Sequence, residues 1–477
     1  MDAHTLHARR WLALVILCLG DLMIVLDSTV VNVALPSIRA DLGFTESELA
    51  WVVNAYLLTF GGFLLLGGRL GDLFGHRRLF LGGVAAFTVA SLACGLATTQ
   101  ALLVVARAVQ GVAGAVVSAV ALSLIMTLFQ DGAEKARAMG VFGFVAAGGG
   151  SIGVLVGGVL TDLLSWHWVF LVNIPVGAAV LVMAVRVLPG GGGTGAQRLD
   201  IAGAVTVTAA LMLAVYAIVN GNEAGWLSAR TVGLLGTSAA LLGAFLVIEA
   251  RAANPIMPLE LFRLRNLSVA NVVGVLWAAA MFAWFFVAAL YLQQVLDYTP
   301  LEVGLAFLPA NVIMAAFSLG LSARIVMRFG TRGPLAAGLA CSAAGLALFS
   351  RVTVDGAFAT HVLPGMLLLG IGAGMAFNPM LLVAMGDAHP SQAGAASGIV
   401  NTAFMMGGAL GLAVLASIAA ARTGTLLDDG EARAAALTGG YRLAFLVGAL
   451  FAAAGAGLAA ALLRPAPVAG GEPVAAH

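Results

Sequence analysis

Long apolar stretches, separated by short polar segments, run along almost the whole chain. A helix of about 20 apolar residues crosses a hydrocarbon core of about 30 Å. The pattern therefore predicts an all-α integral membrane protein with fourteen spanning helices. They are expected near residues 11–35, 49–68, 79–98, 101–127, 137–161, 167–187, 200–220, 230–249, 268–292, 303–323, 334–350, 361–385, 395–421 and 441–463.

The composition narrows the class of protein. Of 477 residues, 61% are hydrophobic and 9% are charged, which excludes a water-soluble surface. The first stretch follows Arg9 and Arg10 as in a signal peptide, but it is long, holds two acids and lacks a convincing cleavage site. We expect a retained first helix. The three cysteines lie within apolar stretches, so neither disulfides nor a metal site is expected. No cofactor and no nucleic-acid partner are expected.

The basic residues predict the orientation in the bilayer. With the N-terminus inside, sixteen Lys and Arg residues fall on cytoplasmic segments, six on outer segments and one within a span. Because cytoplasmic loops carry the excess of basic residues, both termini are expected in the cytoplasm of a multi-pass protein of the cytoplasmic (inner) membrane.

The first span holds two carboxylates, Asp21 and Asp27. An ionised carboxylate at the centre of a spanning helix costs about 2.5–3.5 kcal/mol on insertion scales. Asp27 could be an acid near a helix end that reaches water, but the polar Ser28, Thr29 and Asn32 favour a functional carboxylate that faces a water-filled cavity. Asp21 points about 120° away on an ideal helix, so it is a rival site rather than a partner.

The fourth span contains Arg107, about two turns into the apolar stretch, and Gln110. Arg107 either extends to the outer surface or needs a carboxylate or several carbonyls inside the membrane. If it faces Asp27, burial and the neighbouring cation act in opposite directions on the charge of that carboxylate. Asp27, Arg107 and Asp21 are therefore the candidates for proton coupling.

The loop after the second span, Gly67 to Arg78, combines glycines that permit a tight turn with an acid among cations. A partial copy follows 255 residues later, where Arg324, Phe329, Gly330 and Arg332 match Arg69, Phe74, Gly75 and Arg77, while Met327 replaces Asp72. Parallel repeats of this kind are typical of one large class of transporters.

The fifth span is rich in glycine. It imitates a dinucleotide-binding motif (Gly148, Gly150, Gly153) and a hydrolase motif (Gly149, Ser151, Gly153), but both require a preceding strand. We interpret Gly149, Gly153 and Gly157 as small residues that let another helix approach closely.

Polar and aromatic residues of other spans are candidates for a substrate cavity. For most of them the alternative role is structural: contact with lipid for the aromatic residues, or a hydrogen bond between helices for the polar ones. The candidates are Asn32, Asn54, Gln110, Trp277, Trp284, Gln294, Asn311 and Asn401.

The spans group into an N-terminal six-helix bundle (residues 1–188) and a C-terminal six-helix bundle (261–464). Between them, residues 189–260 are expected to form an inserted two-helix hairpin with cytoplasmic linkers. Residues 465–477 form a cytoplasmic tail.

Together these stretches resemble the fourteen-span drug:proton antiporter family of the major facilitator superfamily, from about residue 11 to residue 463. The matching positions are Asp27, Asn32 and Pro36; Gly68, Asp72, Gly75, Arg77 and Arg78; Arg107, Gln110 and Gly111; Gly149, Gly153, Gly157 and Gly158; and Trp166, Trp168, Asn173 and Pro175. Three positions depart from the family pattern: Ala113 for glycine, His167 for arginine and Val154 for a proline that would kink the fifth helix.

The resemblance implies alternating access, with two bundles that rock around a central cavity and export driven by inward proton flow. It implies that Asp27 is a proton or cation site and that Arg107 tunes it. It also implies that Asp72, with Gly68, Gly75, Arg77 and Arg78, forms a cytoplasmic gate, and that Gly149, Gly153, Gly157 and Gly158 form an antiporter motif.

We therefore expect a proton-coupled exporter of small amphipathic, drug-like compounds. A dedicated exporter of one endogenous product, such as an antibiotic or a lipid, stays open. An uptake symporter is disfavoured by the antiporter motif. A membrane enzyme is disfavoured because no plausible metal-ligand set or nucleophile–base pair is found. The sequence leaves open which compound is carried, the proton stoichiometry and whether the protein acts as a monomer.

Overall fold

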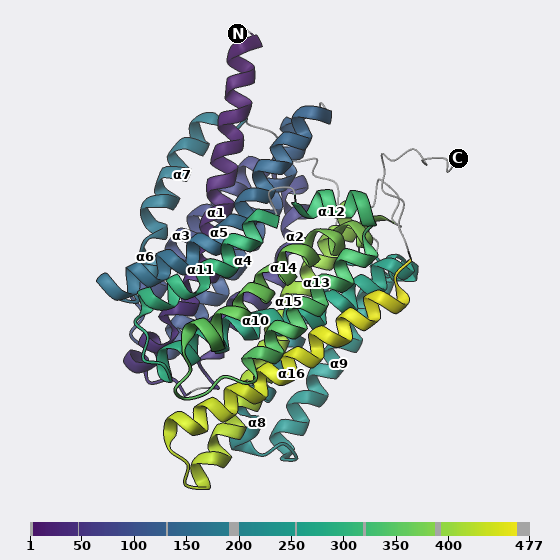
Figure 1. The fold of residues 1–477 in the computed structure, drawn as a ribbon. Helices are drawn as coiled ribbons and strands as arrows, with labels where there is room; N and C mark the ends of the chain where they lie inside the picture. Colours follow the sequence, from purple (N-terminus) through teal and green to yellow (C-terminus); the bar gives the residue numbers. More distant parts are fainter. Residues whose placement is uncertain are drawn as a thin grey trace.

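The computed structural model describes residues 3–45, 47–129, 132–189, 200–252, 255–317, 321–386 and 393–464, and helices dominate them. Figure 1 shows the helices of the first half, in purple and blue, beside those of the second half, in green and yellow.

The first half contains α1 (Ala3–Leu42), α2 (Ala50–Phe74), α3 (His76–Gly95), α4 (Gln100–Leu128), α5 (Gly132–Leu163), α6 (Trp168–Leu171) and α7 (Asn173–Val187). Two helices follow, α8 (Ile201–Ala224) and α9 (Ala229–Arg251). The second half contains α10 (Arg265–Gln294), α11 (Pro300–Ala316), α12 (Ser322–Phe329), α13 (Arg332–Phe349), α14 (Leu363–Gly386), α15 (Ala393–Asp428) and α16 (Arg433–Leu462). Short helical turns cover Leu259–Arg263 and Phe358–Val362.

Each predicted span overlaps a helix of the structure, but the boundaries differ in places. Twelve of the described helices are long and apolar enough to cross a membrane, while α5 and α11 contribute only shorter apolar segments, Ile152–Leu163 and Pro300–Ala316. The count of fourteen spans therefore stays a prediction. α15 ends at Asp428 and the last helix begins at Arg433, so most of the loop that the predicted spans leave between residues 421 and 441 is helical instead.

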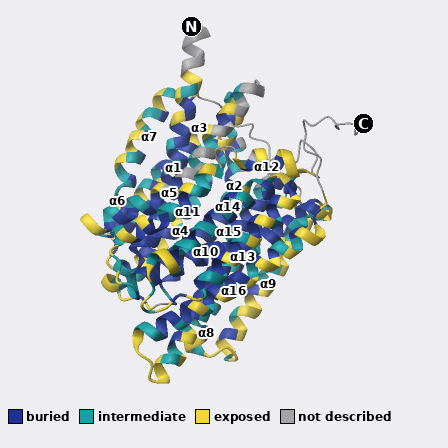
Figure 2. Cartoon of the chain, viewed as in Figure 1, coloured by how far each residue is buried: buried dark blue, intermediate teal, exposed yellow. Residues whose placement is uncertain are grey.

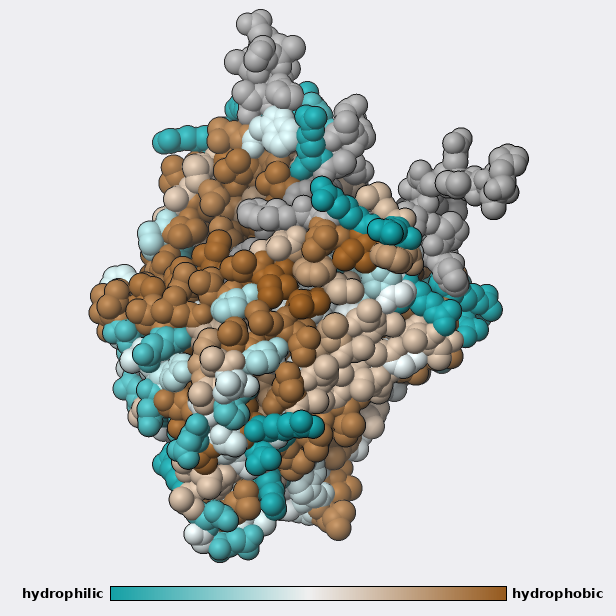
Figure 3. Space-filling view, in the orientation of Figure 1, coloured by the Kyte–Doolittle hydropathy of each residue, from teal (hydrophilic) through white to brown (hydrophobic). Residues whose placement is uncertain are grey.

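Apolar side chains cover much of the outside of the molecule. Figure 3 shows hydrophobic residues over the middle of one face, with hydrophilic residues mainly toward the ends. Large exposed side chains such as Val89 (67%), Leu163 (69%) and Leu450 (60%) would be costly in water and are suited to lipid. The buried residues in turn lie along the middle of the bundle, for example on α10 and α15 (Figure 2).

The two halves repeat one local construction at corresponding helix ends. Gly75 ends α2 with a φ of 89°, and Gly330 ends α12 with a φ of 72°, a conformation that disfavours side chains. Two residues later, Arg77 donates a hydrogen bond to the carbonyl of Val185 on α7, and Arg332 donates one to the carbonyl of Ala460 on α16. The partial sequence repeat thus corresponds to equivalent positions in the fold.

Helices from both halves meet along the middle of the molecule. There α1 contacts α10 and α11, α2 contacts α15, and α5 contacts α11. The pair α8–α9 lies beside this seam, because α8 contacts both α2 and α15. At the end of the seam away from the N-terminus, Arg39 Nη1 donates to Gln294 Oε1 (3.1 Å) and Gln293 Nε2 donates to the carbonyl of Val33 (2.9 Å).

Candidate functional site

The structure brings Asp27 of α1 and Arg107 of α4 into direct contact. Arg107 Nη1 forms an ion pair with Asp27 Oδ2, and both side chains are fully buried. The alternative that Arg107 extends to the outer surface is therefore wrong in this conformation. Asp27 contacts a guanidinium and is fully buried. In this conformation it therefore does not face the water-filled cavity that the sequence had suggested.

Two amide side chains complete the surroundings of Asp27. Gln110 Nε2 and Asn173 Nδ2 donate to Asp27 Oδ1 at 3.1 and 2.8 Å. Both amides also donate to Ser91 Oγ, at 2.7 and 3.4 Å. The network consequently links four helices, α1, α3, α4 and α7, through side chains that are buried.

Further contacts with α2 and α4 hold the Arg107 side chain in place. Its Nε donates to the carbonyl of Val52 (2.9 Å), and Nη1 donates to Gln110 Oε1 (2.9 Å). The guanidinium lies over the ring of Tyr56, 4.4 Å from the centroid, in a cation–π arrangement. Cys94 adds a thiol hydrogen bond to Gln110 Oε1 at 3.2 Å. The cation is therefore positioned by α2 as well as by Asp27.

The predicted glycine stripe of α5 packs against the turn of α1 that carries Asp27. A Cβ on Gly153 would overlap Thr29 Oγ1 and lie 3.1 Å from the carbonyl of Leu26, and a Cβ on Gly157 would lie 2.6 Å from the carbonyl of Val30. Gly158 instead faces α11, where a Cβ would lie 2.6 Å from the carbonyl of Pro300. The glycines thus let α5 touch both the ion-pair helix and the second half.

Asp21 lies apart from this network. Its Oδ1 accepts a hydrogen bond from Ser118 Oγ of α4 at 2.6 Å, and 4% of the residue is exposed. Among the described residues it has no ion-pair partner. The two carboxylates of α1 therefore occupy different environments.

The other cavity candidates are spread over the molecule. Asn32 bonds within α1, to the carbonyls of Ser28 and Thr29, and Gln294 bonds to Arg39. Asn54 is fully buried, and neither polar atom of its side chain has a hydrogen-bond partner within the described part of the chain. Asn311 is buried on α11, and Asn401 is half-buried on α15.

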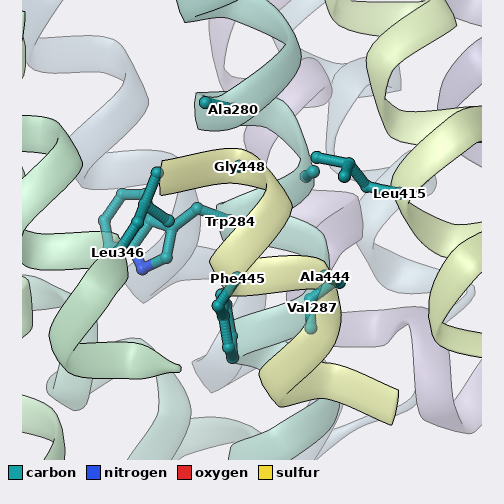
Figure 4. Close-up of a pocket in the computed structure, with 9 residues that line it drawn as sticks. Ala280, Trp284, Val287, Leu346, Leu415, Ala444, Phe445 and Gly448 are labelled. Atoms are coloured by element: carbon teal, nitrogen blue, oxygen red, sulfur yellow. The ribbon is translucent and has the colours of Figure 1, made fainter. Parts of the chain in front are cut away.

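The two tryptophans of α10 lie in separate aromatic groups. Trp277 packs against Phe377 and Phe404, with centroids at 6.3 and 5.4 Å. Trp284 packs edge-to-face with Phe307 and borders a small apolar recess between α10, α13, α15 and α16, with Phe445 and Leu346 beside it (Figure 4). Trp284 thus lies between helices of the second half.

The structure describes four of the five residues of the predicted cytoplasmic gate. Gly68 and Gly75 lie at the end of α2, Arg77 bonds to α7 and Arg78 is exposed. The side chain of Asp72 lies outside the described residues, so its pairing stays a prediction.

Sequence reasoning missed four members of the network. Ser91 is a lone serine in an apolar span, Cys94 follows it by one turn, and Tyr56 lies on α2. Asn173 lay within the sixth-span motif, and that motif is the signal that could have placed it in the site.

Comparison with known proteins agrees with this picture. The sequence model of the Major Facilitator Superfamily matches residues 17–412. Puromycin resistance protein pur8 of Streptomyces alboniger is 40% identical over 451 residues, covering 93% of this chain and 89% of its own. Cephamycin export protein CmcT of Amycolatopsis lactamdurans is 42% identical over 415 residues, covering 86% and 85%. Multidrug resistance protein Stp of Mycobacterium tuberculosis is 36% identical over 431 residues, covering 90% and 79%.

Solved structures of distant transporters share the fold. The nucleoside transporter NupG, in a mutant form, has a TM-score of 0.64 at 12% identity and covers 95% of this chain and 100% of its own. A bacterial homolog of the human lysosomal transporter Spinster, inward-facing and unoccupied, has a TM-score of 0.66 at 16% identity and covers 95% and 98%. At these identities the likeness concerns the fold alone.

Proposed function

The chain belongs to the Major Facilitator Superfamily, and from this premise we propose that it exports small amphipathic, antibiotic-like compounds across the cytoplasmic membrane in exchange for protons. Three of its relatives are named for antibiotic or multidrug resistance or for export, and each aligns over most of its length. Their names support the substrate class, and the family and fold support transport rather than an enzymatic reaction.

The buried Asp27–Arg107 pair carries the proposal of proton coupling. Removing either charge from a buried pair leaves the other uncompensated, which is costly in an apolar interior. A proton that binds Asp27 would neutralise it and release Arg107 from its ionic contact. Because the same network holds α1 to α3, α4 and α7, loading and release of the proton would change how these helices pack.

The repeat supports a proposal of alternating access. In the proposed cycle the two halves rock about the seam where α1, α2 and α5 meet α10, α11 and α15. The fourteen-span topology, the inserted hairpin α8–α9, the cytoplasmic position of both termini and the gate around Asp72 belong to the same proposal. The contact of Arg39 with Gln294 would hold the outer end of the seam closed.

A dedicated exporter of one antibiotic is a second candidate. It is favoured by relatives named for single compounds, such as the cephamycin export protein and a tetracenomycin C resistance and export protein that is 35% identical. A broad compound panel separates the two candidates, because a dedicated exporter transports one compound class and a multidrug exporter several.

The proposed function is tested with purified protein in liposomes and an imposed pH gradient. We expect compounds from the panel to move against their own gradient only while the proton gradient is present, and protons to move in the opposite direction. Movement of compound and protons in the same direction would indicate a symporter. Transport that is indifferent to the pH gradient would contradict proton coupling.

A further inference from the structure

We propose that the helix pair α8–α9 moves as part of the second half during transport, fixed to α15, while α2 of the first half slides along α8. This inference rests on the proposed alternating access and assigns a part in it to the two additional helices. It starts from the different ways in which α8 contacts the two halves. Figure 1 shows α8 and α9, in teal, as neighbouring helices.

The two helices of the pair are joined to each other by hydrogen bonds. Ser238 Oγ of α9 donates to the carbonyl of Ala210 of α8 at 2.8 Å, and Arg230 Nη2 donates to Tyr216 Oη at 2.6 Å. Ser238 is buried, and a buried hydroxyl is costly to leave without a partner. We therefore expect α9 to follow α8 as one body.

Polar contacts connect α8 to the second half near its C-terminal end. Asn222 Nδ2 donates to the carbonyl of Ser417 of α15 at 2.8 Å and to Ser417 Oγ at 3.0 Å. Ser417 Oγ donates in turn to the carbonyl of Ile218 at 3.2 Å. Trp226 Nε1 holds the Asn222 amide in place with a hydrogen bond to its Oδ1 at 3.0 Å. Because 2% of Ser417 is exposed, separating α8 from α15 would leave a buried hydroxyl without these partners.

The contact between α8 and α2 is of a different kind. A Cβ on Gly62 of α2 would overlap Thr208 Oγ1 and lie 3.1 Å from Thr208 Cβ, so the glycine lets the two helices touch. The Thr208 hydroxyl donates within α8, to the carbonyl of Ala204 at 2.7 Å. Trp51 and Tyr216 add a ring contact with centroids 6.5 Å apart. Within the described part of the chain, no hydrogen bond joins α8 to α2.

The position of α8 makes this difference matter for the movement of the halves. It contacts both α2 and α15, and these two helices also meet each other, since a Cβ on Gly61 would lie 3.1 Å from Met405 Cβ. If the halves rock, α8 cannot keep all of its contacts. Sliding α2 along α8 exchanges one apolar contact for another, with protein or with lipid tails. Separating α8 from α15 breaks hydrogen bonds instead, so the contact with α2 is the one that changes.

Two engineered disulfides test the two contacts separately, in a protein with Cys341 replaced by serine. Gly62→Cys with Thr208→Cys would link α8 to α2, since the two Cβ positions lie 3.1 Å apart and disulfides have a mean of about 3.8 Å. Asn222→Cys with Ser417→Cys would link α8 to α15. We expect oxidation of the first pair to abolish pH-gradient-driven export of puromycin from liposomes, with recovery on reduction. Oxidation of the second pair should leave export unchanged.

The oxidised Cys341→Ser protein without engineered pairs is the control, and mass spectrometry after maleimide labelling shows whether each disulfide has formed. A distance measurement then tests the proposal without transport. Spin labels are attached in pairs at Leu227 between α8 and α9, at Glu431 after α15 and at Leu96 after α3, which are all exposed. Between acidic and alkaline pH, the Leu96–Glu431 and Leu96–Leu227 distances should change together, while the Leu227–Glu431 distance stays constant.

A change of the Leu227–Glu431 distance would overturn the proposal, because α8–α9 would then not move with the second half. So would loss of export with both disulfides, or with neither. A constant Leu96–Glu431 distance would contradict alternating access itself, on which the proposed function and this inference both rest. If wild type exports no puromycin, the proposed function fails for that compound, while the three distances still decide how α8–α9 moves.

Discussion

At the scale of single residues, the site is centred on the ion pair of Asp27 and Arg107. Both side chains are fully buried, and Gln110, Asn173 and the carbonyl of Val52 fill further hydrogen-bonding positions. Removing one partner of such a pair typically costs about 3–5 kcal/mol, because the remaining charge stays buried without compensation.

This cost predicts that the effects of two substitutions on stability are not additive. Arg107→Ala should lower the unfolding temperature in detergent markedly, since Asp27 loses its only cationic partner in the described residues. The double variant Arg107→Ala with Asp27→Asn should recover a large part of the loss, because no unpaired charge remains. Thermal unfolding of the purified variants measures this. A double variant that is less stable than either single one would show that the pair does not act as a unit.

The sequence located the two charged residues of the site and Gln110, but it did not assign Ser91, Cys94 or Asn173 to the site. Asp27 and Arg107 could be identified because ionisable residues deep in apolar spans are costly and rare. Ser91 and Cys94 give no such signal, because small polar residues in a span commonly bond within their own helix or to a neighbour. Which residues of α3 and α7 face Asp27 depends on the rotation of each helix, which packing decides.

At the scale of elements, the glycines of α5 explain how three helices approach one another. Gly153 lies against Leu26 and Thr29 of α1, and Gly158 lies against Pro300 of α11. The small-residue stripe was predicted from spacing alone. Its partners were not, because the same spacing permits close contact with any neighbouring helix.

Replacing one of these glycines should separate α5 from α1. Gly153→Ala places a methyl group into Thr29 and the carbonyl of Leu26, so the helices must shift, at a cost of about 1–3 kcal/mol. We expect a lower unfolding temperature and slower export. Gly82→Ala on α3 is the control, because nothing lies within 4 Å of a Cβ there. Equal effects of the two substitutions would contradict the packing argument.

At the scale of the whole molecule, helices of the first and second halves of the chain meet along one seam, and the pair α8–α9 lies beside it. Each stretch that hydropathy predicted as a span overlaps a helix of the structure, because apolar stretches of this length have few alternatives in a bilayer. Hydropathy could not predict that the sixth span breaks into α6 and α7, or that α8 contacts both α2 and α15, because those features depend on contacts between distant segments.

The predicted orientation gives a labelling experiment. Leu227, between α8 and α9, is 94% exposed and should face the outside, whereas the exposed Glu260 should face the cytoplasm. In a variant with Cys341 replaced by serine, Leu227→Cys should react with an impermeant maleimide added to intact cells, and Glu260→Cys should react only after the cells are opened. The reverse result would invert the topology.

The most direct test of proton coupling is transport by Asp27→Asn. The substitution keeps the size of the side chain and one acceptor oxygen, replaces the other oxygen with an amide donor, and removes the ability to bind and release a proton. In liposomes with an imposed pH gradient, wild type should accumulate substrate against its gradient, and Asp27→Asn should bind substrate but show no gradient-driven accumulation. Asp27→Asn that accumulates substrate at the wild-type rate would contradict the assignment of Asp27 as the coupling residue.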